Sequence, residues 1–274
     1  MISTRACRRN RREALAAWFV PAAWLILAAL GAMLPAAPAR PEGSLADSPD
    51  TLVGEYRHST LTLAGQARRS VATIARRGEG FAIAWQEDEG NLFGGIGLSL
   101  DGVFGAAYTE ALSGEFRGSF VAAYRIAGGT LEGVRLPHGA PQPLVRERLQ
   151  GAPGLQGRYD IVGGDGGSPG SVEITRQGDT YQMIWQAPDQ TYEGVGLRIG
   201  DVLVAGFARG FAPALVAYCA DAHVLTGLAT YGHAGTVTPD RLVQAGTDGN
   251  TAAAEPSTRC RAAIDKWNPS LKRG

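Results

Sequence analysis

The chain has 274 residues with 26 basic and 26 acidic side chains, so its formal net charge at neutral pH is zero. Five arginines and one glutamate lie in the first 39 residues, so the remainder carries a net charge of −4. A mildly acidic chain lacks the positive surface that nucleic-acid binding needs, which excludes that class of partner. The 38 glycines predict a turn-rich, all-β protein.

Residues 1–39 have the pattern of an export signal. Arginines before residue 13 precede Ala14–Ala37, a run without a charged or polar side chain. As a helix it would span about 36 Å, against about 30 Å of hydrocarbon in a bilayer, which favours a retained signal-anchor helix. Ala37-Pro38-Ala39 matches a cleavage site instead and favours a removed signal peptide, and both alternatives stay open. Either one predicts export across the bacterial inner membrane, to a periplasmic, inner-membrane-anchored or secreted location.

Beyond a linker at residues 40–49, the chain contains a repeat of about 100 residues. The segment Ser70–Gln86 is matched by Ser171–Gln186, and Gly78 and Trp85 recur as Gly178 and Trp185. This period exceeds the roughly 20–50 residues of a solenoid or propeller unit and fits a whole domain. We therefore expect a duplicated domain, with copies at residues 50–150 and 154–246.

Each copy alternates apolar with polar or small residues, as in Phe81-x-Ile83-x-Trp85, and glycine-containing turns separate the runs. A period of two is typical of strands with one face in a core. The predicted strands start near residues 53, 70, 80, 93, 103, 119, 130 and 143, and near 157, 171, 180, 192, 202, 214, 224 and 236. Closure removes exposed strand edges, so we expect two tandem eight-stranded antiparallel meander barrels. A single sheet shared by the copies is the second alternative, and an outer-membrane barrel is the third.

The remaining tail, residues 247–274, is predicted to begin as a flexible linker and to form a short helix over Thr258–Trp267. Cys219 and Cys260 are the only cysteines after the N-terminal segment. Two cysteines in an exported protein commonly pair, which predicts a disulfide that ties the tail to the second copy; two unpaired thiols are the alternative.

The sequence shows no complete catalytic motif, so we predict that the protein is not an enzyme. The run 166–170 has G-x-S-x-G spacing, but Pro169 lacks the N–H that an oxyanion hole requires and a strand follows. The glycines around Gly95 and Gly194 do not form a dinucleotide-binding fingerprint. The four histidines, at 58, 138, 223 and 233, belong to no Cys/His cluster, so we predict solvated loop residues and no metal. No cofactor is predicted.

Aromatic residues that recur in both copies are the one constellation that suggests a site. They are Tyr56, Phe81, Trp85 and Tyr124 in the first copy and Tyr159, Tyr181, Trp185 and Tyr218 in the second. Ligand pockets are mostly apolar and aromatic, whereas a small eight-stranded barrel is often filled by its own side chains. These residues therefore either line a ligand pocket or form the barrel core, and core is the favoured interpretation.

The order of these motifs resembles bacterial envelope proteins named for fibronectin binding. The resemblance is carried by Gly157–Tyr159, Val172–Trp185, Gly194–Gly196 and Leu225–Gly227, and by their counterparts in the first copy. The family's N-P-D-G loop is represented only by Gly164–Gly166 and is lacking in the first copy. The resemblance implies an adhesive or matrix-binding role, although no residue of the motif explains such binding.

We therefore predict an exported, non-enzymatic envelope module that binds an extracellular or envelope protein, or a small apolar ligand. A membrane-anchored structural or assembly factor, attached through residues 14–37 if these are not cleaved, is one alternative. A small-molecule-binding barrel or an enzyme of unknown class, using loop residues such as His138 or His233, is the other.

Overall fold

The computed structural model describes residues 49–61, 66–110, 119–139, 143–165, 169–221, 223–232 and 235–247. They form a 3-10 turn, η1 (Pro49–Leu52), and sixteen strands. The strands of the first copy are β1 (Gly54–Leu61), β2 (Ala67–Arg77), β3 (Gly80–Glu87), β4 (Leu92–Leu100), β5 (Val103–Glu110), β6 (Phe120–Ala127), β7 (Thr130–Pro137) and β8 (Val145–Gly151). Those of the second are β9 (Gly157–Gly164), β10 (Ser171–Gln177), β11 (Thr180–Gln186), β12 (Thr191–Ile199), β13 (Val202–Ala208), β14 (Ala214–Asp221), β15 (Val224–Tyr231) and β16 (Thr238–Gln244).

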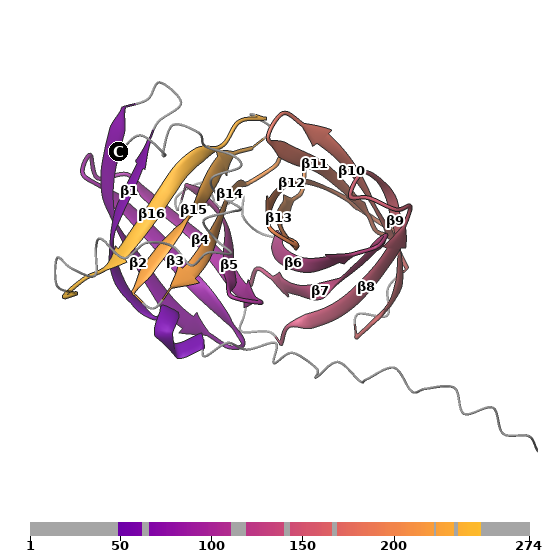
Figure 1. The fold of residues 1–274 in the computed structure, drawn as a ribbon, viewed down its shortest axis with the longest axis horizontal. Helices are drawn as coiled ribbons and strands as arrows, with labels where there is room; N and C mark the ends of the chain where they lie inside the picture. Colours follow the sequence, from indigo (N-terminus) through magenta and orange to yellow (C-terminus); the bar gives the residue numbers. More distant parts are fainter. Residues whose placement is uncertain are drawn as a thin grey trace, which may run out of the picture. The chain divides into compact units, whose positions relative to one another are not determined.

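The strands close into two antiparallel barrels of eight strands each, which confirms the all-β barrel prediction. The first barrel consists of β1–β5 and β14–β16, and the second consists of β6–β13 in up-and-down order. Figure 1 shows the indigo and purple strands β1–β5 in the same barrel as the yellow and orange strands β14–β16. The second barrel is therefore inserted into the first, between β5 and β14.

The expectation of one barrel per sequence copy is corrected by this topology. Strands β6–β8 of the first copy complete the barrel of the second copy, and β14–β16 complete the barrel of the first. At the two junctions Tyr218 lies opposite Phe104, and Tyr124 lies opposite Leu203. Because β6 and β14 are equivalent strands of the repeat, either closure gives the same pairing pattern. The sequence copies at 50–150 and 154–246 thus exchange three strands reciprocally.

Three buried clusters hold the barrels together, and both barrels belong to one compact unit of the chain. One cluster fills the first barrel, and a second fills the other. The third joins the outer faces of β4, β5, β14 and β15 to those of β6, β7, β12 and β13. Strand β13 is consequently buried along its whole length, and β5 over most of it, since each has a core on both faces.

One end of each barrel is closed by a leucine that precedes the first strand of the copy. Leu52 is buried in the first barrel and Leu155 in the second. The hydroxyl of Tyr56 donates a hydrogen bond of 2.9 Å to the carbonyl of Leu52, and Tyr159 bonds likewise to the carbonyl of Gly154. The core side chains fill each barrel at this end. The other end, where β1 or β9 finishes, is the open end.

The predicted signal or anchor (1–39), the linker (40–49, apart from Pro49) and the tail helix lie outside the described residues. Within the part of the chain that the structure describes, no helix has the length and apolar character needed to cross a membrane.

Candidate functional site

Each barrel has a cavity at its open end. The first cavity measures about 450 Å³, and its lining includes His58, Thr60, Arg68, Ser70, Trp85, Glu87, Phe93, Tyr108, Tyr231 and Asp240. The second measures about 440 Å³, and its lining includes Phe120, Arg135, Glu147, Ile161, Pro169, Trp185, Ala187, Gln190 and Tyr192. Both volumes fall in the range of about 300–1,000 Å³ that small-molecule pockets occupy.

The two cavities are equivalent positions of the repeat. Trp85 and Trp185 line them from matching strands. Asp240 in the first cavity and Glu147 in the second are buried carboxylates, 3% and 6% exposed. Each accepts a hydrogen bond of 2.6 Å from a buried tyrosine, Tyr218 for Asp240 and Tyr124 for Glu147. The duplicated sequence therefore builds the same feature twice: an aromatic wall above a buried acid.

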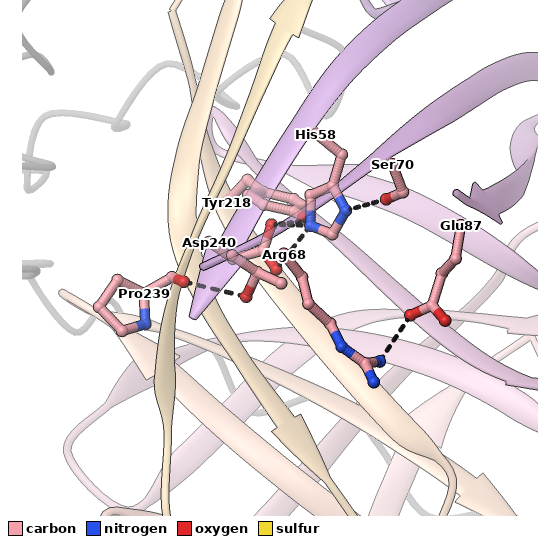
Figure 2. Close-up of polar contacts among 8 residues, drawn as sticks. His58, Arg68, Ser70, Glu87, Tyr218, Pro239 and Asp240 are labelled. Carbon is pink, nitrogen blue, oxygen red and sulfur yellow. Dashed lines mark hydrogen bonds and ion pairs between the residues drawn. The ribbon is translucent and has the colours of Figure 1, made fainter. Parts of the chain in front are cut away.

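His58 connects Asp240 to Ser70 in the first cavity, as Figure 2 shows. Nε2 of His58 lies 2.9 Å from each carboxylate oxygen of Asp240, and Nδ1 lies 2.5 Å from Oγ of Ser70. A carboxylate accepts hydrogen bonds, so the tautomer that matches this contact has its ring proton on Nε2. Nδ1 is then an acceptor, and the Ser70 hydroxyl donates to it.

The backbone explains why these side chains meet. His58 and Ser70 are direct partners across β1 and β2, and Asp240 on β16 lies opposite Thr60. Alternate residues of a strand share a face, so His58 and Thr60 both point into the barrel. Arg68 and Ser70 share the cavity face of β2 for the same reason, and Nη1 of Arg68 contacts Oε1 of Glu87 at 2.9 Å.

Aromatic rings form the apolar wall of the first cavity. The rings of Trp85 and Tyr108 lie 4.4 Å apart between centroids, and Phe93 meets Tyr108 edge-on at 6.2 Å. Burial raises the pKa of Tyr108 well above its ordinary value, and the negative charge of Asp240 acts in the same direction. The phenol therefore stays protonated at neutral pH.

In the second cavity the buried acid contacts an arginine, whereas in the first it contacts a histidine. Nε of Arg135 lies 3.4 Å from Oε2 of Glu147, and its guanidinium lies 5.4 Å from the Phe120 ring and 5.6 Å from the Trp185 ring. Burial raises the pKa of Glu147, whereas the charge of Arg135 and the hydrogen bonds from Tyr124 and Arg135 oppose that rise. The second cavity thus pairs its buried acid with a cation that also stacks on aromatic rings.

Of the eight aromatic residues singled out in the sequence, Trp85 and Trp185 line the cavities. The other six pack in the barrel interiors below: Tyr56, Phe81 and Tyr218 in the first barrel and Tyr124, Tyr159 and Tyr181 in the second. Along each barrel axis, the tryptophan therefore lies at the cavity and the other aromatic residues lie in the core. The hydroxyls of Tyr124 and Tyr218 connect the two zones by supporting the buried acids.

His58 differs from the solvated loop residue that was expected, because it lies within β1 with its side chain 11% exposed. Its place in the alternation Tyr56-x-His58-x-Thr60 is the signal that identifies it as inward-facing. His138 is half-buried, and burial lowers its pKa with help from Arg77. His223 is exposed and contacts Gln244, whereas His233 lies outside the described residues.

Cys219 is buried on β14 and is disulfide-bonded. Its predicted partner, Cys260, lies outside the residues that the structure describes. Among the described residues, no three His, Cys, Asp or Glu side chains gather in a way that could hold a metal ion.

Comparison with protein-family models, with curated proteins and with solved structures gave no match.

Proposed function

We propose that this protein is a small-ligand-binding module of the bacterial envelope, with one binding site at the open end of each barrel. The observation that carries the proposal is the pair of equivalent cavities of about 450 and 440 Å³. Each combines a tryptophan wall with one buried carboxylate, a combination of apolar surface and few polar groups that is typical of ligand sites.

The linings indicate an amphiphilic ligand. Trp85 and Tyr108 in the first cavity, and Trp185 and Phe120 in the second, offer flat apolar faces. Each cavity also presents an arginine, Arg68 or Arg135, beside a carboxylate. A ligand with an aromatic or aliphatic body and an anionic or hydroxyl-bearing head fits this arrangement, because the body would cover the rings and the head would meet the guanidinium.

The envelope location rests on the sequence of the N-terminal segment. Basic residues followed by the apolar run 14–37 are typical of a chain that inserts into or crosses the inner membrane. A module tethered or released there would present both cavities to ligands of the envelope. The resemblance to fibronectin-binding envelope proteins is compatible with this location and names a different, protein ligand.

The test is native mass spectrometry of the full chain titrated with 1-anilinonaphthalene-8-sulfonate, an anionic aromatic probe. We expect two bound probes per chain. Thr60→Trp is designed to fill the first cavity and Ala187→Trp the second, so each should leave one bound probe, and the double variant none. Val71→Trp is the matched control, because Val71 is 42% exposed on β2 and does not line either cavity. Probe binding that neither filling variant reduces, or no binding by the wild type, would refute the proposal.

A further inference from the structure

The first cavity contains a serine, a histidine and an aspartate that are joined by hydrogen bonds. Oγ of Ser70 is hydrogen-bonded to Nδ1 of His58, and Nε2 of the same ring is hydrogen-bonded to Asp240 (Figure 2). With the ring proton on Nε2, the Ser70 hydroxyl is the donor to Nδ1. A hydroxyl, a base that accepts its proton and an acid that orients the base recur on unrelated folds, and such sets are recognised by geometry and role. The ring here presents Nδ1 rather than Nε2 to the serine, and either nitrogen can accept a proton.

The second barrel shows that the fold does not require these side chains. By register, Ile161 occupies the position of His58, and Gly170 that of Ser70, while Glu147 matches Asp240. The second barrel closes and keeps its cavity with an apolar residue and a glycine there. The serine and histidine are therefore specific to the first cavity and are not needed for barrel closure.

Access is the second requirement of a nucleophile. Ser70, His58 and Asp240 all line the first cavity, so a bound molecule would reach the hydroxyl directly. Asp240 is fixed from below by the 2.6 Å hydrogen bond from Tyr218. Burial, followed by the charge of Asp240, raises the pKa of Tyr218 well above its ordinary value, so the phenol keeps its proton and remains a donor.

We propose that the first cavity is an acyl-transfer site that hydrolyses carboxylic esters, with Ser70 as nucleophile, His58 as general base and Asp240 as the positioning residue. The inference rests on the proposed function, because the ester must first bind in this cavity. Arg68 lies two residues from Ser70 on the same face of β2 and lines the cavity in an ion pair with Glu87. We assign its guanidinium to the stabilisation of the developing oxyanion.

Water is the only reactant that the reaction needs besides the ester. Oγ of Ser70 forms a bond to the ester carbonyl carbon while its proton passes to Nδ1 of His58. The bond to the leaving oxygen then breaks, and the departing alkoxide takes that proton and leaves as the alcohol. Water, deprotonated by Nδ1, attacks the acyl-serine, and the proton returns to Oγ as the carboxylic acid is released. The net change is ester plus water to acid plus alcohol.

The cavity also defines the class of ester. Trp85, Phe93 and Tyr108 provide a wall for an aromatic or medium-length aliphatic acyl group. A volume of about 450 Å³ admits a small ester and excludes a folded protein substrate. We therefore expect 4-nitrophenyl esters of such acids to be turned over in preference to 4-nitrophenyl acetate.

The first experiment treats the full chain with a fluorophosphonate probe and maps the modified peptide by mass spectrometry. This measurement needs no variant, so it does not depend on whether a mutant folds. Covalent modification of Ser70 alone is the expected result. Modification of serines at random, or none at Ser70, would overturn the inference.

Steady-state hydrolysis of 4-nitrophenyl hexanoate tests the roles. Ser70→Ala and His58→Gln should each lower kcat/KM by about 100-fold or more, the usual contribution of a positioned base or nucleophile. Asp240→Asn should lower kcat and leave KM unchanged, a split that a purely structural defect would not give. Ser171→Ala is the matched control, because Ser171 is a buried strand serine that does not line either cavity.

Failure of this inference can be distinguished from failure of the proposed function. If Ser70→Ala still binds two molecules of 1-anilinonaphthalene-8-sulfonate but hydrolysis is the same as in the wild type, the cavity binds ligands and the acyl-transfer role is wrong. If the wild type binds no probe and hydrolyses no ester, both are wrong.

Discussion

Tyr124 on β6 donates a hydrogen bond of 2.6 Å to Glu147 on β8, inside the second barrel. The acid is 6% exposed and the tyrosine is fully buried. Burial raises the pKa of Glu147 because the site withholds water from the charged form, and the nearby Arg135 only opposes this effect. The floor of the second cavity therefore holds an acid that folding makes easier to protonate.

This relationship predicts a pH-dependent effect of Glu147→Gln. A carboxyl whose pKa is higher in the folded protein than in the unfolded chain contributes most to stability below the unfolded pKa, and that contribution is lost as pH rises through the folded pKa. The free energy of unfolding of the wild type, relative to Glu147→Gln, should therefore increase as pH is lowered from about 7 to about 4. Urea unfolding followed by circular dichroism at several pH values measures it.

Glu132→Gln provides the control for this prediction. Glu132 lies on β7 in an ion pair with Arg148 in which both side chains are more than half exposed. Its substitution should change the free energy of unfolding only slightly, since exposed ion pairs contribute little. A wild type that loses stability relative to Glu147→Gln on acidification would contradict the assigned direction.

Two equivalent glycines opposite the buried tyrosines should not tolerate a side chain. Gly133 pairs with Tyr124 and Gly227 with Tyr218. A Cβ at either position would fall well inside van der Waals contact with a backbone carbonyl, that of Ala123 or Ala217. Backbone cannot move aside as a flexible side chain can, so Gly133→Ala and Gly227→Ala should each cost about 1–3 kcal/mol or more.

Thermal unfolding of both variants, alongside Gly163→Ala, checks this expectation. A Cβ on Gly163 would meet no atom within 4 Å. Its melting temperature should therefore remain close to that of the wild type, whereas those of the other two fall together. Unequal effects at Gly133 and Gly227 would show that the two barrels are not equivalent at these positions.

Strand positions were readable from the sequence because alternation and turn glycines are local signals. Each predicted start lies within three residues of an observed one. The turn glycines Gly78 and Gly178 adopt φ values of 61° and 57°, a conformation that favours glycine. The strand exchange was not readable, because β6 and β14 carry equivalent patterns and the pattern alone does not tell which of them pairs with β5.

The exchange also determines which acid meets His58. In a barrel built from the first copy alone, β8 would close against β1 and bring Glu147 to His58. The observed closure brings β16 there instead, so His58 contacts Asp240, which is 182 residues away. Trp85 and Trp185 recur in both copies, and so does the buried acid. His58 and Ser70 have no counterpart in the second copy, where Ile161 and Gly170 take their places, so the repeat does not point to them.

The disulfide of Cys219 gives a prediction about the tail. Cys7 and Cys260 are the only other cysteines of the chain. Intact-mass measurement of the full chain should show a gain of two hydrogen atoms on reduction, and a non-reduced digest should contain Cys219 joined to Cys260. A closed loop of about 40 residues would contribute roughly 4 kcal/mol in the chain-entropy model. Cys7→Ser should leave the linked peptide unchanged, and a peptide that links Cys7 to Cys219 would overturn the pairing.

A final prediction concerns the contact between the barrels. Gly105 on β5 and Val204 on β13 are equivalent positions of the repeat, and they face each other: a Cβ on Gly105 would overlap the Val204 side chain. The neighbouring pair has the glycine on the other barrel: Gly206 is on β13 and faces Ala107 on β5. A Cβ on Gly206 would lie 2.8 Å from the Cβ of Ala107. A small residue on one barrel thus accommodates a larger one on the other.

Exchanging the first pair should preserve this complementarity. Gly105→Val should cost about 1–3 kcal/mol through overpacking, and Val204→Gly should also destabilise by leaving a cavity. The double variant should be more stable than the sum of the single effects predicts, by about 1 kcal/mol or more. Val71→Gly, at an exposed site of β2, corrects for the intrinsic cost of glycine in a strand. Urea unfolding of the four proteins completes the cycle, and strictly additive effects would mean that the two residues do not pack against each other in solution.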